Sequence, residues 1–385
     1  MKRLFRYLIV VISALVLFSF VKFRSRQYPP SPNDFPRATE SRPNAQVSKA
    51  TAAPLTSASP PSAAERLEAI LPLLTGSKDG AANRKLLAEL RQLLDGLPVG
   101  IASREVRSFL ASNKDAATSL DVTVKPGGLL GDASSLRVFL LDYLGQIDRA
   151  ASGVMASQLL SHYTTPDEWA VSLRNYAWAN PGPAGEDYLR GKARELLSND
   201  EWVRNPSSGF LEAFDTIVHA HGHTLAPELA RLVRDKENKA TAHAAYLTLD
   251  RLTLAEPSAM FKQLVEQPGL MQGREQTRAN FLARADVRET YQRALVEKYL
   301  LDPTRSAQEL ATFAGLYPNA NFMISNNLLT PTVTPKHEDL AAHDRAALET
   351  VRAWQKDEQF RDLKPYLETI QTKLEGFVQQ AAANP

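Results

Sequence analysis

Hydrophobic residues recur every three or four positions through most of the chain from Ala63 onward. This spacing places apolar side chains on one face of a helix, whereas a half-buried strand would alternate them at every second position. We therefore predict an all-α fold over residues 63–381, in which only residues 120–128 (LDVTVKPGG) look like a strand. The first of these stripes is formed by Leu67, Ile70, Leu71 and Leu74.

Capping and breaking residues indicate where the helices begin and end. Thr165 precedes Pro166 and two acidic residues, and Ser306 precedes Glu309 by three positions, the spacing of a capping box. Pro- and Gly-rich breakers lie between segments of a length typical of helices. They predict helix pairs over residues 135–163, 166–198, 207–236, 239–268 and 273–301, followed by two final helices over 338–356 and 358–381.

Pairs of this length favour an α-solenoid of stacked helix pairs with a HEAT- or TPR-like rhythm. In such a fold a pair buries its apolar stripe only by packing on the next pair. The chain shows no recurring consensus residues, so the rhythm predicts an architecture and not a family. An irregular multi-helix bundle is the alternative.

One long segment between predicted helices, residues 316–339, interrupts this rhythm. Segments of this length without helix or strand are uncommon and tend to be functional or disordered. Its apolar residues argue against disorder, so we predict that it packs back on the helices and caps the array. Alternatively it forms part of a binding surface through Phe322, Met323 and Ile324.

The first residues differ from the rest of the chain. Residues 1–26 contain an uncharged apolar run flanked by basic residues, which predicts an uncleaved signal anchor that forms one transmembrane helix. A cleaved signal peptide is the alternative, but the run ends in bulky residues that a signal peptidase disfavours. Residues 27–62 hold eight prolines among Ser, Thr and Ala and predict a disordered linker. We expect a cytoplasmic amino terminus and an extracytoplasmic, periplasmic location for most of the chain.

Charge and cysteine content exclude several classes of function. The net charge is +2, yet residues 1–26 contain six basic and no acidic residues, so the remainder is slightly acidic. Nucleic-acid binding needs clustered Lys and Arg, which are lacking, and we expect no nucleic-acid partner. The chain has no cysteine, which rules out disulfides, thiolate metal sites and cysteine nucleophiles.

The densest group of chemically active residues is HAHGH, residues 219–223, with three of the seven histidines. We interpret it as a helix end. His219 and His221 would lie in the last turn, Gly222 would adopt the left-handed conformation, and Thr224 would cap the next helix ahead of Pro227 and Glu228. A metal site is the alternative, because His219 and His223 would share a face if the helix continued.

Other candidates give weaker signals. His162 and Tyr163 are expected at a helix end, and Asp142 and Asp148 need not meet. No GxSxG or GxxxxGK[ST] motif occurs. We therefore predict no catalytic, cofactor-binding or metal-binding residue and no cofactor. Packing within the fold is the expected role of three tryptophans in the middle of the chain: Trp169, Trp178 and Trp202.

These patterns together predict a membrane-tethered helical-repeat scaffold or binding protein at the cell envelope, without catalysis of its own. Its partners would be a protein or other macromolecule, and the lipid bilayer through the amino-terminal helix. The alternative is an extracytoplasmic hydrolase or lytic enzyme whose site is assembled from distant residues. That enzyme could be metal-dependent through the cluster His219–His223.

Overall fold

The computed structural model describes residues 62–162, 164–332 and 337–383. The predicted anchor over residues 1–26, and all but the last residue of the predicted linker over 27–62, lie outside these described residues. Within the described part of the chain, every helix is too short or too polar to cross a membrane.

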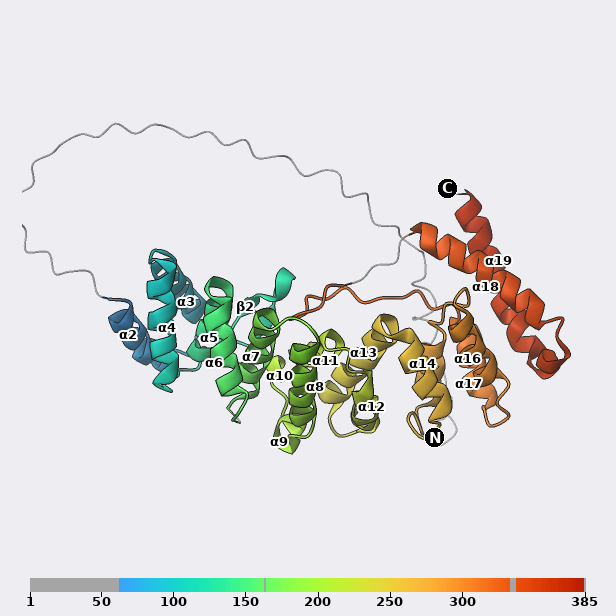
Figure 1. Ribbon diagram of the computed structural model, residues 1–385, viewed down its shortest axis with the longest axis horizontal. Coiled ribbons are helices and arrows are strands. Elements are labelled where there is room, and N and C mark those ends of the chain that lie inside the picture. Colours follow the sequence, from blue (N-terminus) through green and yellow to red (C-terminus); the bar gives the residue numbers. More distant parts are fainter. Residues whose placement is uncertain (1–61, 163, 333–336, 384–385) are drawn as a thin grey trace, which may run out of the picture. The chain divides into compact units, whose positions relative to one another are not determined.

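The first described elements are helices with one small hairpin among them (Figure 1). Strands β1 (Thr123–Val124) and β2 (Leu130–Asp132) are antiparallel and carry a register irregularity between Thr123 and Val124. The strand expected within residues 120–128 is thus present but short. In chain order the elements are α2 (Ala63–Gly76), α3 (Gly80–Asp95), α4 (Val99–Ala111), β1 (Thr123–Val124), η1 (Pro126–Gly128), β2 (Leu130–Asp132), α5 (Leu136–Ile147), α6 (Arg149–Leu159), α7 (Pro166–Ala179) and α8 (Pro183–Leu197).

The remaining elements are also helical. Before the histidine cluster, the chain forms three helices of five residues each, α9 to α11. The elements are α9 (Asp200–Arg204), α10 (Ser208–Glu212), α11 (Asp215–His219), η2 (His223–Leu225), α12 (Ala226–Arg234), α13 (Lys239–Ala255), α14 (Pro257–Glu266), α15 (Glu275–Leu282), α16 (Thr290–Leu300), α17 (Ala307–Leu316), α18 (His337–Trp354), η3 (Glu358–Leu363) and α19 (Lys364–Ala383).

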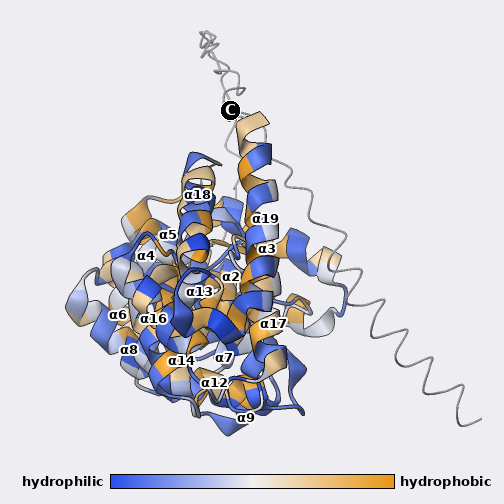
Figure 2. Ribbon diagram, turned by 90° about the vertical axis from the view of Figure 1, so that its right-hand side faces the viewer, coloured by the Kyte–Doolittle hydropathy of each residue, from blue (hydrophilic) through white to orange (hydrophobic). Residues whose placement is uncertain are grey.

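Helices pack both on their immediate neighbours and on the next helix but one. Immediate neighbours in contact include α6 with α7, α12 with α13 and α18 with α19. Contacts one helix further along join α5 to α7, α11 to α13, α15 to α17, and α17 to α19. Figure 2 shows hydrophobic and hydrophilic residues on the same helices, as amphipathic packing requires. The predicted all-α fold is confirmed for the described residues.

The caps read from the sequence are present in part. Thr165 accepts a hydrogen bond from the Glu168 amide (3.2 Å) and begins α7, as predicted. Ser306 likewise accepts from the amide of Glu309 (3.1 Å). The Glu309 carboxylate, however, forms a buried ion pair with Arg278 (2.7 Å) instead of completing a capping box. The Glu309 carboxylate therefore binds Arg278 of another helix instead of the backbone amide of Ser306, which the capping-box spacing predicted.

Candidate functional site

The histidine cluster lies at a helix end, as expected, but its backbone differs from the prediction. His219 is the last residue of α11. His221, with φ of 52°, adopts the left-handed conformation that we had assigned to Gly222, whose φ is −87°. Gly222 is needed for space instead, because a Cβ there would lie 2.8 Å from the backbone oxygen of Ile217. The prediction for Gly222 was therefore wrong about conformation.

The predicted cap after the cluster is also wrong. Thr224 lies within the short 3-10 helix η2, and α12 begins at Ala226 without a side-chain cap. Pro227 and Glu228 do lie in the first turn of α12, as expected. The 3-10 turn continues directly into α12, so its own carbonyls take the place of a separate capping residue.

The three imidazoles have different surroundings. His219 is half-buried, His221 is exposed, and His223 places Nδ1 2.5 Å from Oε2 of Glu256 on the α13–α14 junction. Across residues 62–162, 164–332 and 337–383, no three His, Asp or Glu side chains are grouped so that they could hold a metal ion. The histidine cluster thus forms one His–Glu contact and provides no set of metal ligands among the described residues.

Burial lowers the pKa of His219 below its usual value of 6.5, although Asp215 and Glu186 oppose this effect. The unfolded chain therefore takes up a proton at this position more readily than the folded chain, and acidification below about pH 6.5 favours unfolding. We expect His219→Gln to lose less thermal stability than the unmodified chain between pH 7 and pH 5. Melting temperatures at both values test this. His221→Gln is the exposed control, and an equal loss in both variants would contradict the assignment.

Next to the cluster, the start of α11 holds an extended segment, residues 317–332, which we call the strap. Asp215 is buried and accepts hydrogen bonds from the Leu329 amide (2.6 Å), the Thr330 amide (3.0 Å) and the Thr330 hydroxyl (2.5 Å). Arg251 of α13 contacts both Asp215 and Thr330. One carboxylate thus fixes two successive backbone amides of the strap.

Near its start the strap has a second attachment, to the residues that follow α15. The Asn319 amide donates to the Ala283 oxygen (2.7 Å), and the Arg284 guanidinium donates to the Asn321 oxygen (2.6 Å). From this point the strap runs back to the hairpin (Figure 1). Gly128 there has φ of 77°, and a Cβ on it would overlap the oxygen of the buried Leu328. For residues 317–332, the prediction that this segment packs back on the helices is confirmed, but the strap crosses the helices instead of capping the end of the array. Residues 333–336 of the predicted segment lie outside the described residues.

Between the two attachments, the strap exposes apolar side chains. Phe322, Met323 and Ile324 are 40%, 57% and 79% exposed. These are the residues that the sequence indicated as a possible binding surface.

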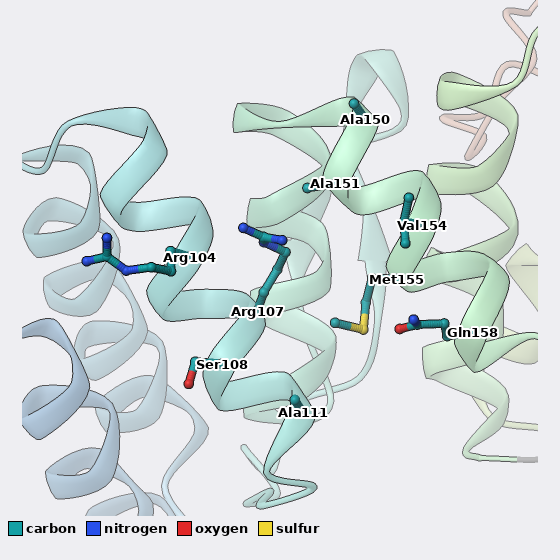
Figure 3. Close-up of a pocket in the computed structure, with 9 residues that line it drawn as sticks. All are labelled: Arg104, Arg107, Ser108, Ala111, Ala150, Ala151, Val154, Met155 and Gln158. Carbon is teal, nitrogen blue, oxygen red and sulfur yellow. The ribbon is translucent and has the colours of Figure 1, made fainter.

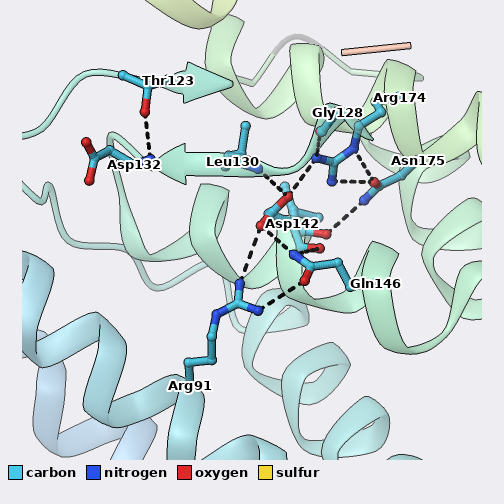
Figure 4. A network of polar contacts seen from close by, with 10 residues as sticks. Arg91, Thr123, Gly128, Leu130, Asp132, Asp142, Gln146, Arg174 and Asn175 are labelled. Atoms are coloured by element: carbon cyan, nitrogen blue, oxygen red, sulfur yellow. Dashed lines mark hydrogen bonds and ion pairs between the residues drawn. The ribbon is translucent and has the colours of Figure 1, made fainter. Parts of the chain in front are cut away.

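A second polar centre, in the helices nearest the hairpin, was not recognised from the sequence. Asp142 of α5 accepts hydrogen bonds from Arg174 of α7 (2.6 Å) and from the Leu130 amide of β2 (3.2 Å) (Figure 4). Its other oxygen accepts from Gln146 (2.7 Å) and lies 3.5 Å from Arg91 of α3. Burial lowers the pKa of Arg174, while Asp142 opposes that change. This network joins three helices and the hairpin.

The other candidates have structural roles. Asp148 caps α6 through the Ala151 amide (3.0 Å) and shares no partner with Asp142, so the two carboxylates form no acid–base pair. His162 is exposed beyond the end of α6, and Tyr163 lies outside the described residues. Trp169 and Trp202 are buried in edge-to-face contact at 5.3 Å, which confirms their packing role.

An open groove of about 560 Å³ lies between α4 and α6 (Figure 3). Both walls are helical stripes with i, i+3, i+4, i+7 spacing. The guanidinium of Arg107 extends from α4 toward α6, whereas that of Arg104 points away from the groove (Figure 3). The α4 wall consists of Arg104, Arg107, Ser108 and Ala111, and the α6 wall consists of Ala151, Val154, Met155 and Gln158, with Ala150 beside them.

Comparison with known proteins gives no relative: no protein-family model, no curated protein and no solved structure matches this chain.

Proposed function

We propose that this chain is a helical-repeat scaffold that binds a macromolecular partner at the cell envelope. In this proposal the described helices form an α-solenoid, and residues 1–26 tether it to the membrane through the linker over 27–62. Most of the chain lies outside the cytoplasm. One observation carries the proposal. Many side chains that form ion pairs or hydrogen bonds between two helices are separated by a similar number of positions along the chain.

Ion pairs recur between side chains 31 to 36 positions apart. Hydrogen bonds from side chains to backbone oxygens follow the same interval, as in Asn175 to Leu141 (34 positions) and Asn238 to Val203 (35 positions). Intervals within so narrow a range are what stacked helix pairs of similar length produce, whereas an irregular bundle has no reason to repeat them. The ion pairs are Arg137–Glu168, Asp142–Arg174, Asp215–Arg251, Asp250–Arg284 and Arg278–Glu309.

The partners of the buried charges favour a binding role over catalysis. Arg137 with Glu168 and Arg278 with Glu309 are buried pairs that link α5 to α7 and α15 to α17. In both pairs the carboxylate is neutralised by the neighbouring helix. A catalytic acid or base needs a side chain directed at a substrate. These carboxylates instead stabilise helix packing.

Two measurements on the full chain test the proposal. A carboxy-terminal alkaline phosphatase fusion is expected to be active, because the folded part would then lie outside the cytoplasm. Chemical crosslinking in intact cells, followed by purification under denaturing conditions, is expected to give a stoichiometric macromolecular adduct. An inactive but well-expressed fusion would contradict the location. Stoichiometric zinc after dialysis, lost in His219→Ala/His223→Ala, without any adduct would contradict the binding role.

A further inference from the structure

The groove between α4 and α6 has the dimensions of a binding site for a third helix. Both helices pack on α5, which lies between them, so they are held apart instead of closing on each other. With 13 and 11 residues, they offer walls about 16–20 Å long, enough for roughly three turns of a partner helix. A groove between two parallel stripes is a recurring way to bind an amphipathic helix.

Small and apolar side chains on both walls of the groove favour the close approach of a partner helix. Ala111 on one wall and Ala151 on the other leave room for a helix backbone. Val154 is 64% exposed and Met155 is half-buried, so both have apolar surface that a partner would remove from water. A Met side chain also adapts its shape to different partners.

The charged residues of the two walls indicate which charge the polar residues of the partner carry. Arg104 and Arg107 are the only charged residues that line the groove among the described residues. Glu105 pairs with Arg104 (2.9 Å). Hydrogen bonds from the Ser103 hydroxyl and the Ala151 amide lower the pKa of Asp148, and the nearby Arg107 charge adds to this effect. Neither acidic residue lines the groove. Arg107 donates its Nε to the Ser103 oxygen (3.3 Å), and its guanidinium extends toward α6 (Figure 3).

We infer that this groove binds an acidic amphipathic helix of a partner protein. Its apolar side chains would pack on Val154 and Met155, and its carboxylates would meet Arg107 at the α4 wall. Bidentate guanidinium–carboxylate contacts would fix the register of the bound helix. This inference rests on the proposed binding function and specifies the chemistry of the partner.

The test uses the full chain in nanodiscs of zwitterionic lipid, with empty nanodiscs as the blank. The probe is a fluorescent 14-residue helical peptide with Leu at i, i+3, i+4 and i+7 and Glu on the flanks. A second peptide has Lys in place of every Glu. Fluorescence anisotropy is expected to show at least ten-fold tighter binding of the Glu peptide. Equal binding of the two peptides would overturn the inference.

Surface variants locate the binding. Val154→Asp is expected to weaken binding of the Glu peptide at least ten-fold, and Arg104→Glu/Arg107→Glu is expected to reverse the preference between the peptides. Val99→Asp is the matched control, since Val99 is 57% exposed on α4, the other helix beside the groove, but does not line it. Binding that is unchanged in both groove variants would overturn the inference. Binding of phosphatidylglycerol vesicles instead of either peptide, lost on changing both arginines, would also overturn it in favour of lipid.

The variants also separate this inference from the proposed function. If the cellular adduct disappears in Val154→Asp and persists in Val99→Asp, the groove is the docking site. If the adduct persists in both variants, the binding function stands and the groove inference fails.

Discussion

Replacing Asp142 by Ala is expected to destabilise the fold by about 3–5 kcal/mol, the typical effect of removing one partner of a buried ion pair. The Arg174 side chain is 0% exposed, and its guanidinium would lose its only carboxylate partner among the described residues. The Leu130 amide would lose an acceptor in the same step. Chemical denaturation of the full chain, followed by circular dichroism at the helical band, measures the change.

The matched control is Lys298→Ala. Lys298 pairs with Glu266 at 3.2 Å and also joins two helices, α16 and α14, but the two side chains are 59% and 40% exposed. Water and salt screen such a pair, so its loss is expected to cost less than about 1 kcal/mol. An Asp142→Ala variant as stable as Lys298→Ala would mean that water or a rearranged side chain neutralises Arg174.

Helix positions were predictable because their signals are local. Thr165 and Pro166 mark the start of α7 through bonds and torsions that involve only the next few residues. The same reasoning failed at Gly222, where glycine is required by the nearby Ile217 backbone and not by its own φ. The sequence shows that a glycine is present. Only the packing shows whether the fold requires its freedom to adopt a positive φ or its lack of a Cβ.

The polar network around Asp142 had a weak signal in the sequence. Asp142 and Arg174 each interrupt an apolar helical stretch, VFLLDYL and AVSLRNY, where a charge needs a partner. Each could have been assigned to a solvent-exposed face, and pairing them required knowing that α5 packs on α7. Buried charges 32 residues apart become recognisable once the interval between helices is known.

The packing of the strap on the helices was predicted, but its attachment to Asp215 could not have been. Asp215 binds backbone amides, which every residue except proline offers, so the sequence of the strap carries little information about its acceptor. Leu329 and Thr330 also lie 114 and 115 positions from Asp215 in the sequence. The groove was missed for a related reason, since its walls look like ordinary solvent-exposed helix faces until α4 and α6 are placed beside each other.

Asp215→Ala is expected to release one end of the strap. The change removes the acceptor of the Leu329 and Thr330 amides and leaves Arg251 without that carboxylate. Hydrogen bonds to a charged acceptor contribute about 1.5–3 kcal/mol each. A loss of about 3 kcal/mol in local opening free energy corresponds to roughly 100-fold faster amide exchange. Hydrogen–deuterium exchange of a peptide that covers residues 325–332 measures this.

The control for this prediction is Glu228→Ala, because Glu228 is a nearby carboxylate that pairs with Arg194 on the surface (3.2 Å) and does not contact the strap. Its exchange at residues 325–332 should match that of the unmodified chain. Asp215→Asn retains one acceptor oxygen without the charge, so its exchange rate should fall between those of Asp215→Ala and the unmodified chain. Unchanged exchange in Asp215→Ala would show that Leu328, buried against Gly128, holds the strap without the carboxylate.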